Sequence, residues 1–274
     1  MKIIADSGST KTKFAVVSDN GDVNFVLTDG INPYYQSGDD IQKCLSTQLL
    51  PNIKIPEKVT SVEFYGAGCS VTDKIETVKY AIKSIFPFAS VIVGSDMIGA
   101  AKALCGKDKG IACIMGTGSN SCLWDGSKIV QNVPALGYII GDEGSGGVLG
   151  KLLVADILKN QAPSDIQELF YSKYNMDAAY IVDRIYKQPF PNRFLASFTP
   201  FLSENINNQY CYNLVYNSFC SFINRNLKQY PSGYKVNFTG SVAYYFKDIL
   251  AKAIADCGME LGIIEREPMQ RLLL

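Results

Sequence analysis

The chain has 274 residues, of which 47% are hydrophobic and 19% are charged, and its 26 basic residues balance 26 acidic ones. This composition predicts a folded globular protein of one or two domains and excludes extensive disorder. Zero net charge and the lack of a Lys/Arg run argue against nucleic acid or an anionic membrane as the partner. No apolar run reaches the roughly 18 residues of a membrane span, and the apolar run after Lys2 stops at Asp6, so we expect a cytoplasmic protein.

The first hundred residues predict a sheet with parallel strands and crossover helices. The expected strands are 2–5, 13–17, 23–28, 61–66 and 89–93. The expected helices are 39–49, 72–86 and a small-residue helix through 103. A tight turn at 18–22, which contains Asn20-Gly21, would join two of the strands as a hairpin. Ser37 or Asp39 is expected near the cap of the first helix. Strands that alternate with helices indicate parallel pairing.

Residues 110–130 predict a buried strand and then a hairpin that turns at Asp125-Gly126. The chain beyond is mostly helical, with helices expected at 147–159, 164–171, 178–186, 205–229 and 242–257, and a final strand at 235–239. The polar segment 106–110 has glycine at both ends, so we place a domain boundary there. The expected domains are 1–106, with 265–274 as a candidate return of the chain to it, and a helix-rich 107–264.

Histidine is absent, and this excludes several kinds of catalytic site. A Ser-His-Asp triad, a Cys-His pair and His-ligated zinc are impossible. Any general base must be a carboxylate, Lys, Tyr or Cys. None of the eight cysteines forms a C-x-x-C pair, and reduced, buried thiols are the simplest interpretation.

An apolar strand that ends in a small polar loop is the recurring pattern of this chain. It occurs four times, and the loops begin at Asp6, Gly94, Gly116 and Gly240. Ligands of α/β proteins bind at the carboxyl ends of strands, where such loops lie. Another segment has six glycines between 137 and 150. Glycine at this density weakens regular structure but lets the backbone approach a ligand or present N–H groups to an anion. Tight turns are the alternative interpretation.

Taken in order, these loops resemble those of the actin-like ATPase superfamily, which contains sugar kinases, actin and heat-shock chaperones. The detailed motifs are similar to the N-acetylglucosamine kinase branch of the BadF/BcrA-type ATPase family, over nearly the whole chain. The matching segments are 6–12, 116–120, 141–145 and 240–242, of which G-D-E-G-S at 141–145 is the most specific. Ser7 and Arg271 stand where that family usually has glycine.

The resemblance implies an α/β fold with two actin-like (ribonuclease H-like) domains and a ligand cleft between them. It implies an ATP-dependent kinase that phosphorylates the 6-hydroxyl of an amino sugar, with N-acetylglucosamine as the first candidate. ATP and Mg²⁺ would be the cofactors. The partner would be a small-molecule sugar, and a homodimer is left open.

Two aspartates are the candidates for the central chemistry. Phosphoryl transfer needs positioning, charge neutralisation and a group that orients the attacking hydroxyl. Asp96 follows a buried strand and precedes a helix, and the resemblance implies that it is the general base; a helix N-cap is the alternative. Asp6 would hold Mg²⁺ through water, because magnesium prefers a few carboxylates together with phosphate oxygens. A turn residue at a strand end is its alternative.

The other candidate residues divide into two groups. Those expected to bind ATP are Ser9, Thr10, Lys11, Thr117, Gly118, Gly240 and Ser241. Those expected to bind the sugar are Asn32, Asn120, Tyr138, Asp142 and Glu143. The alternatives are a solvated lysine at 11, a core tyrosine at 138, and a helix cap at 143.

An ATPase that activates a partner enzyme is a second functional hypothesis, because some BadF/BcrA relatives drive electron transfer to dehydratases. Such activators share a bridging iron–sulfur cluster, which needs exposed cysteines near the glycine-rich loops. Cys105, Cys113 and Cys122 lie near the loops in sequence, but Cys113 is within a predicted buried strand. A sugar sensor without catalysis is a third hypothesis, and the presence of both Asp6 and Asp96 argues against it.

Overall fold

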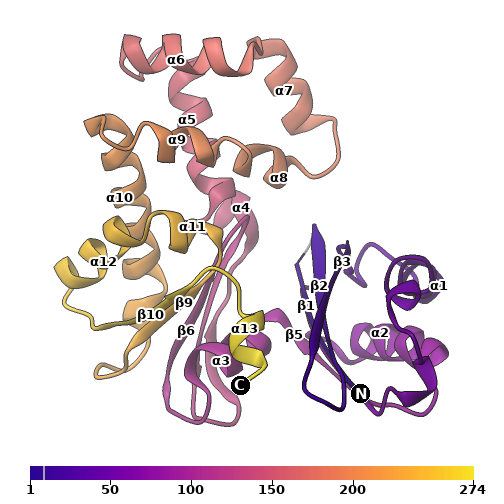
Figure 1. The fold of residues 1–274 in the computed structure, drawn as a ribbon. Helices are drawn as coiled ribbons and strands as arrows, with labels where there is room; N and C mark the ends of the chain where they lie inside the picture. Colours follow the sequence, from indigo (N-terminus) through magenta and orange to yellow (C-terminus); the bar gives the residue numbers. More distant parts are fainter. Residues whose placement is uncertain (9) are drawn as a thin grey trace. The chain divides into compact units, whose positions relative to one another are not determined.

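The computed structural model describes every residue except Ser9 and divides the chain into two compact units. Unit 1 contains Met1–Gly106 and Pro268–Leu274, and unit 2 contains Lys107–Glu267 (Figure 1). Each unit is built on a five-stranded mixed sheet. The closing residues of the chain therefore belong to the same unit as its start.

The sheet of unit 1 has the strand order β3-β2-β1-β4-β5. Its strands are β1 (Lys2–Ser7), β2 (Lys11–Val17), β3 (Val23–Asp29), β4 (Ser61–Gly66) and β5 (Ser90–Ser95). The first three are antiparallel neighbours, whereas β1, β4 and β5 are parallel, as the sequence predicts. In this register Ser7, Gly66 and Ser95 lie side by side at the carboxyl ends of the three parallel strands.

The helices of unit 1 cover both faces of its sheet. They are α1 (Gly38–Cys44), α2 (Thr72–Ile85), α3 (Asp96–Cys105) and the C-terminal α13 (Met269–Leu272). Alternate residues of β1 face opposite sides of the sheet: Ile3 belongs to the core that includes Ile41 of α1, and Ile4 belongs to the core that includes Met269 of α13. Ser37 caps α1 in a capping box, as expected, but the helix is α-helical only to Cys44 and continues as a π-helical turn to Leu49.

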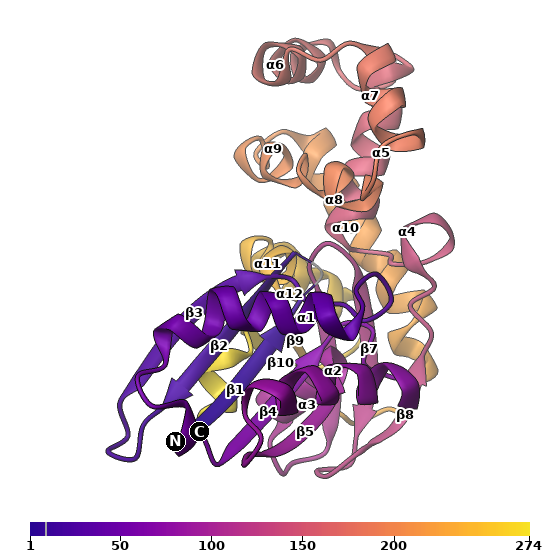
Figure 2. The same ribbon diagram turned by 90° about the vertical axis from the view of Figure 1, so that its right-hand side faces the viewer.

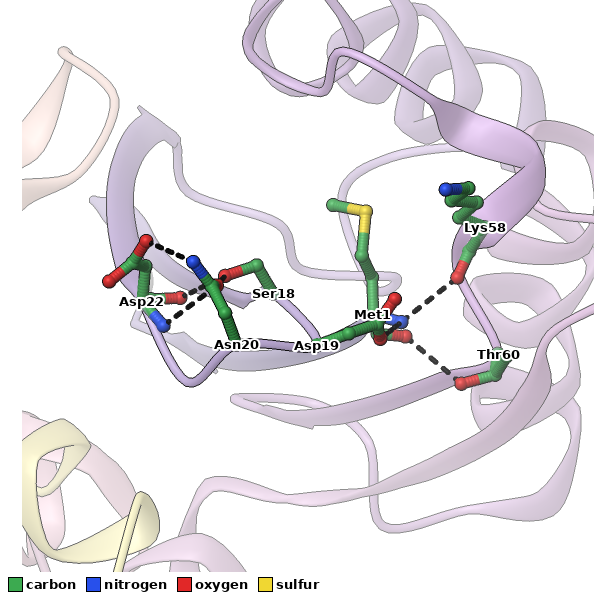
Figure 3. Close-up of polar contacts among 7 residues, drawn as sticks. All are labelled: Met1, Ser18, Asp19, Asn20, Asp22, Lys58 and Thr60. Carbon is green, nitrogen blue, oxygen red and sulfur yellow. Dashed lines mark hydrogen bonds and ion pairs between the residues drawn. The ribbon is translucent and has the colours of Figure 1, made fainter.

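A polar network ties the chain start to its neighbours in unit 1 (Figure 3). The Met1 ammonium donates to Asp19 Oδ1 at 2.7 Å and to the Lys58 carbonyl at 3.0 Å, and the Thr60 hydroxyl donates to the Met1 carbonyl at 3.1 Å. Asn20 Nδ2 donates to Asp22 Oδ2 at 2.7 Å and fixes the predicted hairpin turn. The start of β1 is thereby joined both to this turn and to the start of β4.

The sheet of unit 2 repeats the plan of the first, with the order β10-β9-β6-β7-β8. Its strands are β6 (Gly110–Met115), β7 (Ser119–Trp124), β8 (Ile129–Val133), β9 (Val236–Thr239) and β10 (Leu261–Glu265). Here β6, β7 and β8 are antiparallel neighbours, whereas β9 and β10 run parallel to β6. This arrangement confirms the predicted class of two actin-like α/β domains. The expectation that 235–239 is the last strand is wrong, because β10 follows it.

Helices make up most of the remainder of unit 2. They are α4 (Gly137–Ile140), α5 (Gly146–Leu158), α6 (Ser164–Tyr174), α7 (Ala178–Tyr186), α8 (Pro191–Ala196), α9 (Thr199–Glu204), α10 (Gln209–Arg225), α11 (Ser241–Tyr245) and α12 (Lys247–Asp256). In both views α6 and α7 are the helices farthest from the sheet of this unit (Figures 1 and 2). The predicted helix over 242–257 is in fact two helices that meet at Phe246. Apart from Ser9, which is not described, the chain contains no helix that is long and apolar enough to cross a membrane.

Candidate active site

Asp96 is the first residue of α3 and lies directly after β5. The preceding residue, Ser95, is the helix cap, because its hydroxyl accepts a hydrogen bond from the Ile98 N–H at 3.3 Å. The alternative that Asp96 is itself the N-cap is therefore wrong. Its Oδ1 accepts the Met97 N–H at 2.8 Å, which fixes the direction of the carboxylate.

The surroundings of Asp96 favour a carboxylate that is more basic than usual. Burial raises its pKa, against the smaller lowering effect of the hydrogen bond from the Met97 N–H. The thiol of Cys69 is close enough for the charge of Asp96 to affect its pKa. Burial first, and then the charge of Asp96, raises the pKa of Cys69 to about 12. A half-buried carboxylate with a raised pKa can accept a proton from a substrate hydroxyl.

Asn32 is placed by contacts on three sides. Its Oδ1 accepts the Tyr34 N–H at 3.0 Å, and its own backbone N–H donates to Gln36 Oε1 at 2.7 Å. On the third side it lies against Gly68, where an added Cβ would be 2.5 Å from Asn32 Oδ1. The loop 66–70 thus contacts Asn32 through Gly68 and adjoins Asp96 through Cys69. The sequence indicated the loop 66–70 as another small-residue loop at the end of a strand. None of its residues was among the predicted site residues.

The first predicted phosphate loop is only partly described, because Ser9 lies outside the described residues. Thr10 and Lys11 are exposed, and Lys11 is the first residue of β2. Ser7, which replaces the usual glycine, is buried: its hydroxyl hydrogen-bonds with Thr12 Oγ1 at 2.7 Å and donates to the Ile31 carbonyl at 3.0 Å. The serine therefore fastens this loop to the residue that precedes Asn32.

Asp6 offers oxygen chemistry that fits magnesium. It lies half-buried near the end of β1, in register with Lys13 of β2. No group of three Cys, Asp or Glu side chains among residues 1–8 and 10–274 could hold a metal ion by itself. Mg²⁺ seldom needs such a cage, because it keeps several waters and binds through one or two carboxylates together with substrate phosphates. The carboxylate of Asp6 is of the kind that this mode requires.

The second predicted phosphate loop joins β6 to β7 and is fastened to the start of α5. The Gly116 N–H donates to the Gly118 carbonyl at 2.9 Å, which closes the turn. The N–H groups of Gly146 and Gly147 donate to the carbonyls of Gly116 and Thr117 at 2.8 and 3.0 Å. The first N–H groups of α5 thus hold the loop, so this loop and the G-D-E-G-S segment form one structure.

Asp142 is the link between these two segments. It is buried, with a backbone φ of 54°, and its Oδ1 accepts the Ser119 N–H at 3.2 Å. Burial raises the pKa of Asp142 to about 6, with a smaller raising effect from the charge of Glu143. This hydrogen bond shows that Asp142 stabilises the 116–119 turn, independently of any contact with a sugar.

We expect Asp142→Asn to be more stable than the wild type at pH 8. The pKa of Asp142 is about 6 in the folded protein and ordinarily 3.8, so between these pH values the native state holds a proton that the unfolded state has lost. As the pH rises through about 6 the native state must carry the buried charge, and the free energy of unfolding falls. Asparagine keeps the acceptor for Ser119 without the buried charge. Urea unfolding at pH 8 should show a gain of up to roughly 3 kcal/mol, which shrinks towards zero below about pH 4. A variant that is less stable than the wild type at pH 8 would contradict this expectation.

The other predicted sugar residues of unit 2 have partners within that unit. Glu143 forms an ion pair with Arg225, whose Nε lies 2.6 Å from Glu143 Oε1. It does not cap α5, because the Ser145 hydroxyl does so by accepting the Val148 N–H. Asn120 Oδ1 accepts from Asn132 Nδ2 at 3.0 Å. Tyr138 packs half-buried against the core of unit 2, which agrees with the core interpretation.

A cavity of about 430 Å³ in unit 2 brings two of the predicted ATP residues together. Thr117 and Ser241 line it, whereas Gly118 and Gly240 do not. Gly240 instead lies behind Ser241, where its φ of 120° and an added Cβ only 2.3 Å from the Met115 carbonyl oxygen exclude any other residue. Val242, from the predicted segment 240–242, also lines it. The lining residues that the sequence did not indicate come mainly from α8, α9 and the end of α11: Ala196, Thr199, Pro200, Ser203, Glu204, Tyr245 and Phe246. A size of this order suits a nucleoside.

No protein-family model and no curated protein matches the chain. Among solved structures it is similar to the putative N-acetylglucosamine kinase from Porphyromonas gingivalis, at 42% identity and a TM-score of 0.96, over 100% of this chain and 97% of the relative. It also resembles the putative N-acetylglucosamine kinase from Chromobacterium violaceum, at 15% identity and a TM-score of 0.76, over 99% and 97%. Component A of (R)-2-hydroxyglutaryl-CoA dehydratase from Acidaminococcus fermentans matches at 13% identity and a TM-score of 0.52, over 99% and 94%. The last two likenesses concern the fold alone.

Proposed function

The chain belongs to the N-acetylglucosamine kinase family of actin-like sugar kinases, and we propose that it transfers the γ-phosphoryl group of ATP to the 6-hydroxyl of N-acetylglucosamine. The observation that carries the proposal is the position of Asp96. This carboxylate follows the end of β5, is released from helix capping by Ser95, and is half-buried with a raised pKa. A group of that kind is what an attacking hydroxyl requires.

Asp96 is the general base of the proposed reaction. The sugar O6 forms a bond to the γ-phosphorus, the bond from that phosphorus to the bridging oxygen breaks, and ADP leaves. The carboxylate of Asp96 takes the hydroxyl proton and later releases it to solvent. Because the transition state has little covalent character, the remaining site residues contribute by positioning and by neutralising charge.

The nucleoside of ATP is assigned to the cavity of unit 2. Two loops reach it, through Thr117 and Ser241, and the aromatic ring of Tyr245 completes its wall. Within unit 2 the turn 116–118 would meet the phosphates. Thr10 and Lys11 are the proposed phosphate-binding residues of unit 1. Magnesium, held through water by Asp6, would neutralise phosphate charge. Asn32, Asn120, Asp142 and Glu143 are the proposed hydrogen-bonding residues for the sugar hydroxyls.

A coupled ADP-release assay with Mg-ATP tests the proposal directly. The sugar panel is N-acetylglucosamine, glucosamine, N-acetylmuramic acid and glucose, and phosphorus NMR would locate the new phosphate on the product. We expect turnover with N-acetylglucosamine and a 6-phosphate product. Slow ATP hydrolysis that is indifferent to every sugar would overturn the proposal.

The partner-activating ATPase is less well supported. Cys113 and Cys122 are both fully buried, on β6 and β7, where they cannot bind a cluster shared with another molecule. Cys105 is half-buried at the end of α3. The likeness to the dehydratase component is one of fold, at 13% identity. These positions favour the kinase.

A further inference from the structure

We propose that Gly68 is a positioning residue for the sugar: the missing side chain at this position lets the loop 66–70 hold the amide of Asn32 in its binding orientation. The inference rests on the proposed function, because Asn32 is taken to contact the sugar. It concerns a residue that touches neither the reacting atoms nor ATP in the proposed mechanism.

The loop 66–70 is anchored before it reaches Asn32. The Ala67 N–H donates to the Ser7 carbonyl at 3.0 Å, which fastens the loop to the end of β1. The Cys69 N–H donates to the Gly66 carbonyl at 3.1 Å and closes a turn. Within that turn Gly68 has a φ of +82°, a conformation that side chains disfavour. The position of Gly68 is thus set by backbone hydrogen bonds and does not depend on Asn32.

Asn32 has little room to move away from this loop. A Cβ at position 68 would lie 2.5 Å from Asn32 Oδ1, 3.2 Å from Asn32 Cγ and 2.9 Å from a ring carbon of Tyr34. The backbone next to Asn32 is pinned as well, since the Ile31 N–H donates to the hydroxyls of Ser7 and Thr12, each at 3.2 Å. An added methyl group would therefore push on an amide whose backbone cannot retreat.

The hydrogen bonds also decide which way the amide faces. The backbone N–H of Tyr34 can only donate, so the Asn32 atom that it meets at 3.0 Å must be the oxygen. Within the part of the chain that the structure describes, Nδ2 has no hydrogen-bond partner of its own. Asn32 is thus arranged to donate to a sugar hydroxyl oxygen. The contact with Gly68 on the Oδ1 side maintains this arrangement.

The test is the kinetics of Gly68→Ala with N-acetylglucosamine and Mg-ATP. We expect the KM for the sugar to rise at least tenfold, while the KM for ATP and kcat stay within threefold. Gly21→Ala is the matched control, because Gly21 also has a positive φ, +89°, but an added Cβ there meets nothing within 4 Å. The control should keep the wild-type KM. A wild-type KM in Gly68→Ala overturns the inference.

A double-variant cycle shows whether Gly68 acts through Asn32. Asn32→Ala should raise the KM for the sugar, and adding Gly68→Ala to it should change that value less than twofold. A further tenfold rise in the double variant would overturn the inference. The double variant also serves if Gly68→Ala alone does not fold, because it lacks the amide, which is the group nearest to the added Cβ.

The outcomes separate this inference from the proposed function. If the wild type phosphorylates the sugar but Gly68→Ala behaves like Gly21→Ala, only the role of Gly68 falls. If the wild type neither turns over N-acetylglucosamine nor binds it in calorimetry, both fall together.

Discussion

Asp96→Asn is expected to lower sugar-dependent turnover by about 10²- to 10⁴-fold, the usual contribution of a general base. The KM values for sugar and ATP should stay within a few-fold, because the amide has the shape of the carboxylate. Its oxygen can still accept the Met97 N–H, which the carboxylate accepts at 2.8 Å. Rapid-quench and steady-state ADP release would give the rate. A variant that keeps more than a tenth of the wild-type kcat would show that another group accepts the proton.

The matched control for this variant is Asp73→Asn. Asp73 lies in the first turn of α2, as Asp96 lies in the first turn of α3, and its side chain is 70% exposed. Asp73→Asn removes an exposed negative charge near a helix N-terminus, which costs roughly 0.3–1 kcal/mol of stability. The control should therefore show the effect of losing such a charge on stability and none of the loss of turnover. Similar activity losses in the two variants would point to folding and away from proton transfer.

The pH dependence of turnover offers an independent readout of the same residue. Burial raises the pKa of Asp96, so its carboxyl holds a proton, and cannot accept one, at pH values where an ordinary aspartate is already ionised. We expect kcat/KM to fall on the acid side with a midpoint above the ordinary value of 3.8. The residual rate of Asp96→Asn should lack this acid limb.

The sequence predicted the strands and their end loops because those features depend on local pattern. Buried apolar runs that stop in Gly, Ser or Asp mark the carboxyl ends of strands, and the parallel register then sets Ser7, Gly66 and Ser95 in one row. Ser95-Asp96 shows the limit of that reasoning. Either residue can cap a helix, and only the hydrogen bond from the Ile98 N–H assigns the role to Ser95.

The cavity of unit 2 could not be predicted from the sequence, for two physical reasons. No helix is expected between 186 and 205 from the sequence, yet Pro191 and Pro200 occupy the first turns of α8 and α9 there, where the missing N–H has no partner to lose. The wall of the cavity also combines side chains that lie about 130 residues apart, from Thr117 to Tyr245. Such a wall depends on how helices pack, which periodicity does not specify.

Gly150→Ala is expected to destabilise the protein by about 3 kcal/mol, at the upper end of overpacking costs. In an exposed helix the same change would stabilise by about 1 kcal/mol, because alanine is the better helix former. Here an added Cβ would lie 1.9 Å from the Leu195 carbonyl oxygen and 2.5 Å from its carbon. Both are backbone atoms of α8, so no side chain can rotate away and α5 must separate from α8. Urea unfolding would measure the loss.

Gly38→Ala is the control, since an added Cβ at the first residue of α1 meets its nearest atom, Tyr80 Cδ1, at an ordinary 3.5 Å. It should be neutral or slightly stabilising. Gly150→Ala should also raise the KM for ATP, because the N–H groups of Gly146 and Gly147 at the start of α5 hold the carbonyls of the 116–117 turn. A helix displaced at Gly150 would move that turn, which lines the cavity through Thr117. Unchanged stability in Gly150→Ala would mean that α5 and α8 are not packed as closely as described, and the assignment of the cavity to the nucleoside would weaken with it.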